Sequence, residues 1–207
     1  MSNHNKVVMI DYGAGNIRSV QKAFEYVGTQ VKLVNEPQPI LSADKLVLPG
    51  VGAFGAGIKA IRERGLDTAV VNKARSGTPL LGICLGMQFL FDQSDEMGFH
   101  RGLGLIPGKV TRFDLADMGL KVPHMGWNQI SMNYQHALTT GVPDNSHAYF
   151  VHSYYCIPED ENDILAQTEF GHSFASCVAH DNILGIQFHP EKSQRYGLQI
   201  LQNFVAL

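Results

Sequence analysis

The sequence predicts an α/β fold in which helices cover both faces of a mostly parallel sheet. Strand and helix patterns alternate through the first half of the 207-residue chain, which is typical of β/α/β units. The second half changes to short strands separated by turn-rich segments, expected to add antiparallel strands to the same domain. No linker, internal repeat or low-complexity tract interrupts the chain, so residues 1–207 are predicted to form one domain.

Apolar runs and helical spacing assign the elements of the first half. Residues 7–11 form a strand-like run, and Asn16 is placed to cap a helix that Gly28 ends. Within that helix, apolar residues recur at helical spacing at Ile17, Val20, Phe24 and Val27. Further strands are expected at 31–34, 46–48 and 80–83, and helices around 58–61 and 66–74.

The second half reads as a run of strands that ends in a helix. The expected strands are 109–113, 126–132, 149–156, 164–170, 175–179 and 183–188, and the helix spans about 193–205. Two polar segments, 92–102 and 114–119, are expected to be solvated loops.

Composition excludes several classes of function. A net charge of −3 with 17% charged residues gives no basic surface for nucleic acid or for an anionic membrane. Three cysteines do not suggest a disulfide framework. The longest apolar stretch, Pro79–Phe91, is too short to span a bilayer, and the polar residues 1–6 lack the layout of a secretory signal. We therefore expect a cytoplasmic protein that acts on small molecules or proteins.

Cys84 is the strongest indication of chemistry. It follows an apolar strand, precedes a helix-forming segment, and has glycines two positions before and after it. Such glycines remove side chains that would collide in a sharp strand-to-helix turn, and the helix N-terminus favours a thiolate. The alternative is that Cys84 is a small core residue, as Cys156 and Cys177 are expected to be.

His189 is the best candidate for the base that a nucleophilic cysteine needs. It follows the strand 183–188, and Glu191 lies two positions later, on the same side if the backbone is extended. His152 is the main rival as base. The alternative for His189 and Glu191 is a histidine at a strand-to-loop corner beside a solvated glutamate.

Acyl transfer also requires donors for a developing oxyanion. The N–H of Leu85 follows the nucleophile directly, and the turn Gly50-Val51-Gly52 could bring a second backbone N–H close. Tyr12–Asn16 lacks the third glycine of a dinucleotide-binding loop. No cluster of residues has metal-ligand spacing, so neither a metal nor a cofactor is implied.

These motifs resemble those of a known family. Gly82–Gln88 together with the distant His189–Glu191 resembles the triad (class I) glutamine amidotransferases, whose cysteine attacks the side-chain amide of glutamine and releases ammonia. Within that family, further motifs resemble the glutaminase subunits that work with a separate cyclase. These motifs are Asp11–Asn16, Gly102–Gly108, Pro123–Asn128 and His189–Ser193.

The resemblance implies a flavodoxin-like three-layer fold and a (β/α)8-barrel cyclase subunit as partner in a heterodimer. In such enzymes glutamine hydrolysis is largely silent until the cyclase binds its ribonucleotide, and ammonia then passes through the barrel. The cyclase forms imidazole glycerol phosphate and an aminoimidazole carboxamide ribotide, which serve histidine and purine synthesis.

The resemblance also assigns roles to individual positions. Cys84 is the nucleophile, His189 the general acid/base and Glu191 its orienting partner, whereas Val51 and Leu85, with Gly50 and Gly52, form the oxyanion hole. The positions implied to hold glutamine are Gly52, Gln88, His152, Ser153 and Tyr154. The positions implied to meet the cyclase and gate ammonia are His124, Trp127, Asn128, Tyr149 and Lys192. The same resemblance assigns no role to segments 92–102 and 132–146.

Three alternatives stay open from the sequence. The same chemistry could serve a paralogous synthase, for example one that amidates a sugar. A cysteine variant of the α/β-hydrolases shares the glycine-flanked turn, but its triad carboxylate usually lies well before the histidine. An inert flavodoxin-like binding module would have no need of Cys84, His189 and Glu191 together.

Overall fold

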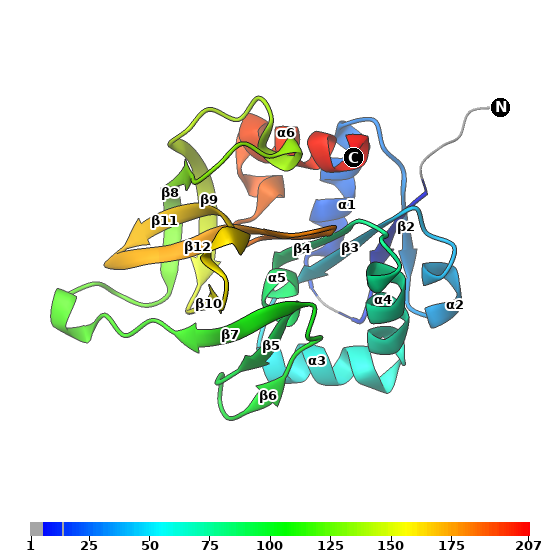
Figure 1. Cartoon of the computed structure of the whole chain (residues 1–207), viewed down its shortest axis with the longest axis horizontal. Helices are drawn as coiled ribbons and strands as arrows, with labels where there is room; N and C mark the ends of the chain where they lie inside the picture. Colours follow the sequence, from blue (N-terminus) through cyan, green and yellow to red (C-terminus); the bar gives the residue numbers. More distant parts are fainter. Residues whose placement is uncertain (1–5, 14) are drawn as a thin grey trace.

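The computed structural model describes residues 6–13 and 15–207 and shows a nine-stranded sheet with helices on both faces (Figure 1). The predicted α/β architecture, mostly parallel at the centre with added antiparallel strands, is confirmed. The polar N-terminal segment expected at residues 1–6 therefore lies almost wholly outside the described residues, as does Ala14 of the Asp11–Asn16 motif.

The strand order of the large sheet explains how distant residues meet. Its parallel part, in spatial order, is β2 (Val31–Val34), β1 (Val7–Ile10), β3 (Lys45–Gly50), β4 (Leu80–Cys84) and β13 (Ile183–Ile186). The antiparallel part continues with β12 (His172–His180), β11 (Ile164–Phe170), β8 (His124–Met132) and β9 (Ser146–His152).

Strand β13 joins the two parts of the sheet. It pairs in parallel with β4, with Ile186 opposite Ile83, and antiparallel with β12. The segments that follow β4 and β13 therefore leave the sheet side by side at its carboxyl edge, where ligands bind in open α/β sheets. This pairing brings the chain after Ile186 next to Cys84.

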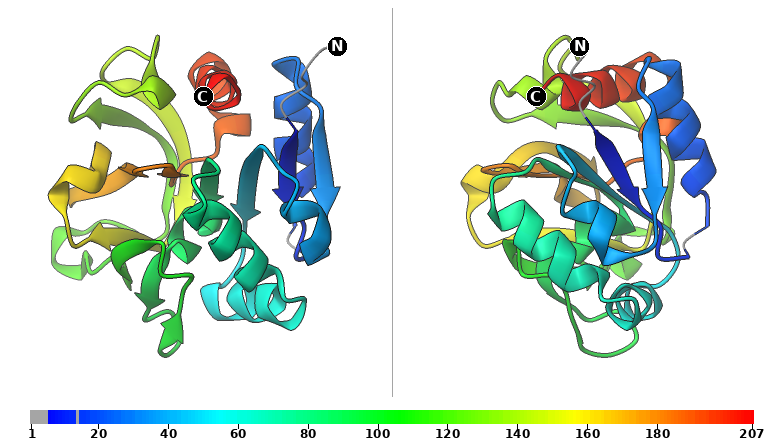
Figure 2. Two further views of the ribbon diagram at one scale, coloured as in Figure 1. Left: turned by 45° about the vertical axis from the view of Figure 1, so that its right-hand side comes forward. Right: turned by 90° about the vertical axis from the view of Figure 1, so that its right-hand side faces the viewer.

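Two groups of helices bury the opposite faces of the parallel strands. Helices α1 (Ile17–Tyr26) and α6 (Gln194–Ala206) cover one face, whereas α2 (Pro37–Ile40), α3 (Phe54–Glu63), α4 (Leu66–Arg75) and α5 (Leu85–Phe89) cover the other (Figure 2). Within β1, Val7 and Met9 pack in the cluster with α1, and Val8 and Ile10 pack in the cluster with α3. This period-two alternation between two apolar faces explains the continuous apolar run.

A second, four-stranded sheet corrects two expectations. Its order is β10 (Tyr154–Pro158), β7 (Ile106–Arg112), β5 (Phe91–Ser94) and β6 (His100–Arg101). Segment 92–102 therefore contains strands and is not simply a solvated loop. The expected single strand 149–156 is in fact divided at Ser153 between β9 and β10, which belong to different sheets.

Short 3-10 helices complete the chain. They are η1 (Ala116–Met118), η2 (Ala137–Thr139), η3 (Glu161–Asp163) and η4 (Pro190–Lys192). One expectation about α1 is wrong: Asn16 precedes the helix, but its side chain makes no capping hydrogen bond. It has a left-handed backbone, with φ of 64°, and its amide is used elsewhere.

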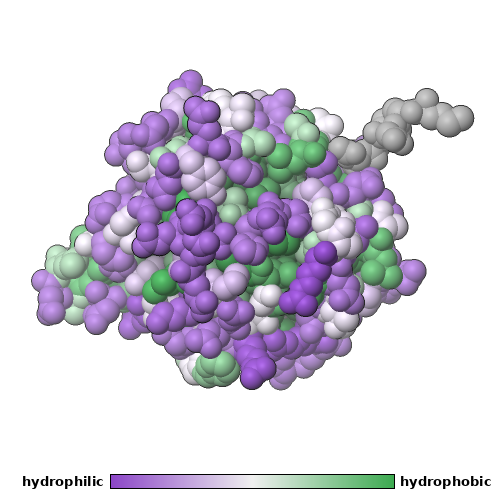
Figure 3. Space-filling view, in the orientation of Figure 1, coloured by the Kyte–Doolittle hydropathy of each residue, from purple (hydrophilic) through white to green (hydrophobic). Residues whose placement is uncertain are grey.

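The surface seen in the orientation of Figure 1 is mostly hydrophilic (Figure 3). Hydrophobic residues on this face occur in separate small groups rather than in one patch. None of the helices within residues 6–13 and 15–207 combines the length and apolar character that a membrane crossing requires.

Candidate active site

Cys84 lies in a strained turn between a buried strand and a helix. It is the last residue of β4, and α5 begins at Leu85. Its φ of 55° and ψ of −114° are unusual for a residue with a side chain. Backbone strain of this kind, about 1–3 kcal/mol, gathers at functional sites. The turn has the geometry of a nucleophile elbow.

The two flanking glycines are required because the backbone is packed too closely for a side chain. A Cβ atom on Gly86 would lie 1.7 Å from the carbonyl oxygen of Leu48, and one on Gly82 would lie 2.7 Å from that of Gly86. The sharp turn expected from the glycine spacing is therefore present. Its cause is contact between β3, β4 and α5, since neither glycine has a positive φ.

His189 and Glu191 form a buried hydrogen-bonded pair. The Nδ1 atom of His189 lies 2.9 Å from Oε1 of Glu191, and the two side chains are 4% and 3% exposed. Their proximity was expected from an extended backbone, but Glu191 lies in η4. The same carboxylate oxygen also accepts a hydrogen bond of 2.9 Å from Nδ2 of Asn16. Glu191 is thus neither solvated nor held by His189 alone.

Backbone contacts fix His189 itself. Its N–H donates to the carbonyl of Tyr149, and its carbonyl accepts a hydrogen bond from the hydroxyl of Ser193. The Ser193 hydroxyl in turn accepts from the N–H of Tyr149. These bonds hold the segment after β13 against the edge strand β9, so the imidazole has little freedom to leave the site.

The imidazole of His189 is held in its charged form. Burial by itself would lower its pKa, but interaction with Cys84 and the hydrogen bond with Glu191, together with the negative charges of both groups, raise the pKa to about 10. The other ring nitrogen, Nε2, is buried and has no partner at hydrogen-bonding distance among the described residues. His189 is therefore an imidazolium at neutral pH, between the carboxylate and the sulfur.

One cavity of about 540 Å³ contains the nucleophile, its histidine and the expected substrate positions. It is lined by Asn16, Val51, Gly52, Cys84, Leu85, Gln88, Glu96, Pro123, Val151, His152, Ser153, Tyr154, His189 and Lys192. Every residue expected to hold glutamine is in this set. Gly50 lies just outside it, where a Cβ atom would meet the backbone N of Gly86 at 2.8 Å.

The geometry of the expected oxyanion hole has two parts. The N–H of Leu85 belongs to the first turn of α5, where backbone N–H groups have no partner within the helix. The N–H of Val51 lies near the hydroxyl of Tyr12. Burial, followed by the charges of Cys84 and Asp11, raises the pKa of Tyr12, so this hydroxyl stays neutral. Tyr12 was not singled out from the sequence.

The surroundings of His152 differ from those of His189. Both nitrogens of the His152 ring are occupied: Nδ1 lies 2.8 Å from the carbonyl of Tyr154, and Nε2 lies 3.1 Å from Nδ1 of His124. Burial lowers the pKa of His152 to about 3. It therefore lacks the free nitrogen and the carboxylate partner that a catalytic base needs.

The residues expected at a partner interface separate into two groups. Trp127 is 46% exposed and packs edge-to-face on Tyr149, with ring centroids 5.9 Å apart, while Nζ of Lys192 lies 5.5 Å from the centre of the Tyr149 ring. His124, however, is buried, and half-buried Asn128 bonds to it. His124 therefore offers no surface to a partner.

Two residues beside the triad were missed from the sequence. Gln187 is fully buried, and its side-chain nitrogen lies 3.8 Å from Sγ of Cys84. Asn16 reaches Glu191, as described above. A polar residue inside the otherwise apolar run 183–188 was the available indication for Gln187, because a buried amide requires partners.

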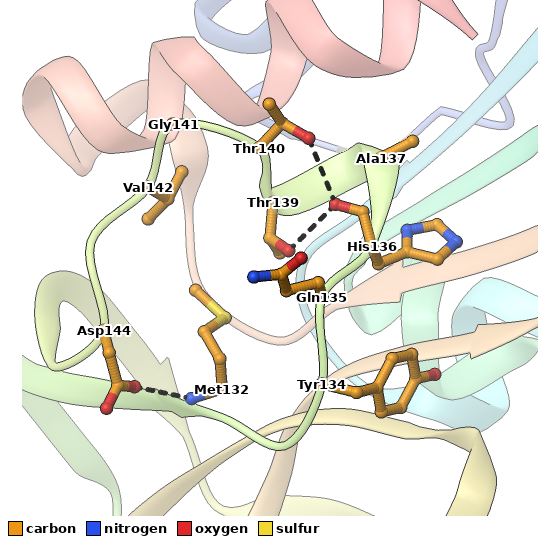
Figure 4. A pocket seen from close by; sticks show the side chains of 10 residues that line it. All are labelled: Met132, Tyr134, Gln135, His136, Ala137, Thr139, Thr140, Gly141, Val142 and Asp144. Carbon is orange, nitrogen blue, oxygen red and sulfur yellow. Dashed lines mark hydrogen bonds between the residues drawn. The ribbon is translucent and has the colours of Figure 1, made fainter.

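A larger cavity elsewhere has no comparable chemistry. Residues between Met132 and Asp144 enclose about 750 Å³ (Figure 4). Its polar groups bond within the segment: Asp144 accepts from the N–H of Met132, and the carbonyl of His136 accepts from two threonine hydroxyls. Neither cysteine nor serine is among its lining residues. In the described part of the chain, no three His, Cys, Asp or Glu residues are placed to hold a metal ion.

Comparisons with known proteins agree with this geometry. Residues 8–207 match the family described as Glutamine amidotransferase class-I. Imidazole glycerol phosphate synthase subunit HisH of Sulfurimonas denitrificans is 50% identical over 200 residues, which cover 96% of each chain. The protein of the same name from Syntrophotalea carbinolica is 48% identical over 202 residues, covering 96% of this chain and 98% of the relative.

A solved structure supports the fold alone. A crystal structure of a glutamine amidotransferase superposes with a TM-score of 0.75 at 20% identity, covering 97% of this chain and 99% of the other.

Proposed function

Because the chain belongs to the class-I glutamine amidotransferase family, we propose that it is the glutaminase subunit of imidazole glycerol phosphate synthase. The observation that supports this most directly is the placement of Cys84, His189 and the expected glutamine positions around one cavity. Near-complete coverage at about half identity to two HisH proteins favours this synthase over a paralogue that amidates a sugar.

Glutamine hydrolysis follows from the arrangement in two steps. The Cys84 thiolate attacks the carbonyl carbon of the side-chain amide, and the N–H groups of Leu85 and Val51 stabilise the oxyanion. The C–N bond breaks as the His189 imidazolium gives its proton to the leaving ammonia, which leaves a thioester. Water then attacks the thioester, His189 takes a proton from it, and the C–S bond breaks to release glutamate. Glu191 orients the imidazole throughout.

The proposed partner is a (β/α)8-barrel cyclase subunit, in a cytoplasmic heterodimer. The exposed Trp127, the Tyr149 ring and Lys192 lie next to one another, and Lys192 also lines the catalytic cavity. A partner seated on this face would cover the mouth of the cavity and receive ammonia directly. The cyclase would then use the ammonia to form imidazole glycerol phosphate for histidine biosynthesis.

Reconstitution with the cyclase tests the proposal. The wild-type pair should form imidazole glycerol phosphate from either glutamine or added ammonia, and glutamate release should rise when the cyclase holds its ribonucleotide. With Cys84→Ala, the glutamine-driven reaction should disappear and the ammonia-driven reaction should persist. A Cys84→Ala pair that still used glutamine would refute the proposal.

A further inference from the structure

Gln187 follows β13 and directs a side-chain amide donor at Cys84, which lies in the turn between β4 and α5. Its Nε2 donates to Sγ of Cys84 at 3.8 Å, a distance that suits an N–H···S contact. Its Oε1 accepts a hydrogen bond of 3.1 Å from Nε2 of Gln88. Both glutamine side chains are buried, with exposed fractions of 0% for Gln187 and 4% for Gln88.

The orientation of Gln187 is fixed by Gln88. The second N–H of Gln88 donates to the carbonyl of Tyr154 at 3.2 Å, and that carbonyl has no proton to give. Gln88 therefore cannot turn its amide over without opposing two oxygens. Since Gln88 must present a donor to Gln187, Gln187 must present its oxygen to Gln88 and its N–H group to the sulfur.

Beyond the Tyr154 carbonyl, this series of hydrogen bonds continues through two histidines, His152 and His124. The Tyr154 carbonyl lies 2.8 Å from Nδ1 of His152, so this nitrogen carries the proton and Nε2 is an acceptor. Nδ1 of His124, 3.1 Å from that acceptor, must then be a donor. Its Nε2 accepts from Nδ2 of Asn128 at 3.2 Å, while the second N–H of Asn128 donates to the carbonyl of Glu169 at 2.8 Å.

Burial supports neutral tautomers along this path. It lowers the pKa of His124 to about 4 and that of His152 to about 3, so neither ring is charged at pH 7. His124 is stacked between Phe150 and Phe170, with ring centroids 4.8 and 4.2 Å away. Rotation of the ring would break this stacking together with both of its hydrogen bonds.

We propose that Gln187 is a further catalytic residue, whose amide stabilises the Cys84 thiolate, and that His124 is a positioning residue that acts on it through His152, Tyr154 and Gln88. This rests on the proposed role of Cys84 as nucleophile. This series of hydrogen bonds begins at Asn128 on β8, and the same strand carries Trp127. A partner on that face would therefore contact a strand that is linked by hydrogen bonds to the sulfur of Cys84.

The donor role is tested by the pH dependence of Cys84 alkylation. Gln187→Met keeps the length of the side chain without the donor, and Gln187→Glu keeps the acceptor for Gln88 without the amide. In the full chain, the midpoint of iodoacetamide labelling on the Cys84 peptide should rise by about one pH unit in both variants. His189, Tyr12 and Cys156, which also interact with the charge of Cys84, are unchanged in these variants.

Kinetics of the complex with the cyclase provide a second readout. Both Gln187 variants should lower kcat/KM for glutamine about tenfold while the ammonia-driven reaction stays unchanged. An unshifted labelling midpoint in a folded variant of either type would overturn the catalytic role. An unshifted midpoint would refute only the role of Gln187, since the wild-type enzyme would still hydrolyse glutamine. The proposed function is tested separately, by Cys84→Ala.

The positioning role is tested by His124→Phe, which keeps an aromatic ring in the stack and removes both hydrogen bonds. We expect KM for glutamine to rise at least about threefold, because Gln88 lines the substrate cavity, with a smaller change in kcat. His172→Phe is the matched control. His172 also packs on aromatic residues, Phe113 and Tyr155, but it takes no part in the series of hydrogen bonds from Asn128 to Gln187. Wild-type KM in a folded His124→Phe enzyme, or an equal change in His172→Phe, would overturn this role.

Discussion

Glu191 holds His189 with an oxygen that also accepts a hydrogen bond from Asn16, so the exposed Asn16 is linked to a buried histidine–carboxylate pair far along the sequence. The carboxylate lies in η4, between β13 and α6, and the asparagine directly precedes α1. Two donors on one carboxylate oxygen fix its position more firmly than the histidine could alone. The orientation of the imidazole therefore depends on a residue that does not touch it.

Asn16→Gly should lower kcat for glutamine hydrolysis by several-fold to about tenfold, because a hydrogen bond to a charged group is lost. Glycine tolerates the φ of 64° at this position, so the backbone need not change. Asn16→Asp should be worse, since it places a second carboxylate beside Glu191. Steady-state glutaminase assays of the complex measure both. A wild-type kcat in Asn16→Gly would show that Glu191 needs no second donor.

The raised pKa of His189 predicts how stability depends on pH. Its pKa rises from an ordinary 6.5 to about 10 on folding, so the stabilisation is complete below pH 6.5 and is lost as pH rises towards 10. His189→Gln removes it. Between pH 6.5 and 10, wild type should lose more unfolding free energy than the variant, by at least about 1.4 kcal/mol, the worth of one pKa unit. Urea unfolding at both pH values measures this, and equal losses would contradict it.

Single residues show how far the sequence could lead. Cys84, His189 and Glu191 could be found because each lies at a predicted strand end with a characteristic neighbour. Asn16 could not, since its contact with Glu191 spans 175 positions and depends on how α1 and η4 pack. Its assignment as a helix cap was chemically reasonable but wrong, because its backbone is left-handed rather than extended as at most N-caps, and its side-chain nitrogen donates to Glu191.

The turn between β4 and α5 is the element on which the geometry of the nucleophile depends. Helix α5 contacts β3 so closely that only glycine fits at position 86. Gly86→Ala should therefore lower the unfolding free energy by about 3 kcal/mol or more. Gly15→Ala is the control, because its Cβ atom would meet Cγ2 of Val51 at an ordinary 3.5 Å. Urea unfolding compares the two, and similar stabilities would contradict the packing argument.

In strand β8 the alternation of buried and exposed residues separates positions that the motif alone grouped together. Three residues of its motif, His124, Trp127 and Asn128, were assigned together to the partner face. In the structure His124 is buried and Asn128 half-buried, whereas Trp127 is exposed, as is Met125. Residues two apart on a strand share a face, so the alternation alone could have separated the groups. Segment 92–102 offered no such pattern: the middle residues of β5 are polar and exposed, and β6 has only two residues.

At the scale of the whole molecule, the parallel pairing of β4 with β13 brings together groups 105 positions apart, as His189 and Cys84 are in the sequence. The pairing was not readable from local patterns, since it requires the chain to return to the centre of the sheet after four antiparallel strands. The alternation in the first half predicted only that the site would lie at the carboxyl edge. Whether residues 1–207 fold as a single domain stays a prediction.

The partner face can be tested by affinity. Trp127→Ala should weaken binding of the cyclase at least about tenfold, because exposed aromatic residues often dominate interface energy. Phe99→Ala is the matched control, since Phe99 is 68% exposed but lies beside β6 in the second sheet. Isothermal titration calorimetry with the cyclase measures both variants. Equal weakening by the two, or none by Trp127→Ala, would place the interface elsewhere.

Covalent trapping tests the central claim most directly. An electrophilic glutamine analogue such as a diazoketone, added to the complex with the cyclase, should attach once per chain. Peptide mass mapping should place the adduct on Cys84, with Cys156 and Cys177 unlabelled because burial raises their pKa. Cys84→Ala should take no label, and His189→Gln should label more slowly. Labelling of Cys84→Ala at the wild-type rate, or an adduct on another residue of the wild type, would contradict a Cys84 nucleophile.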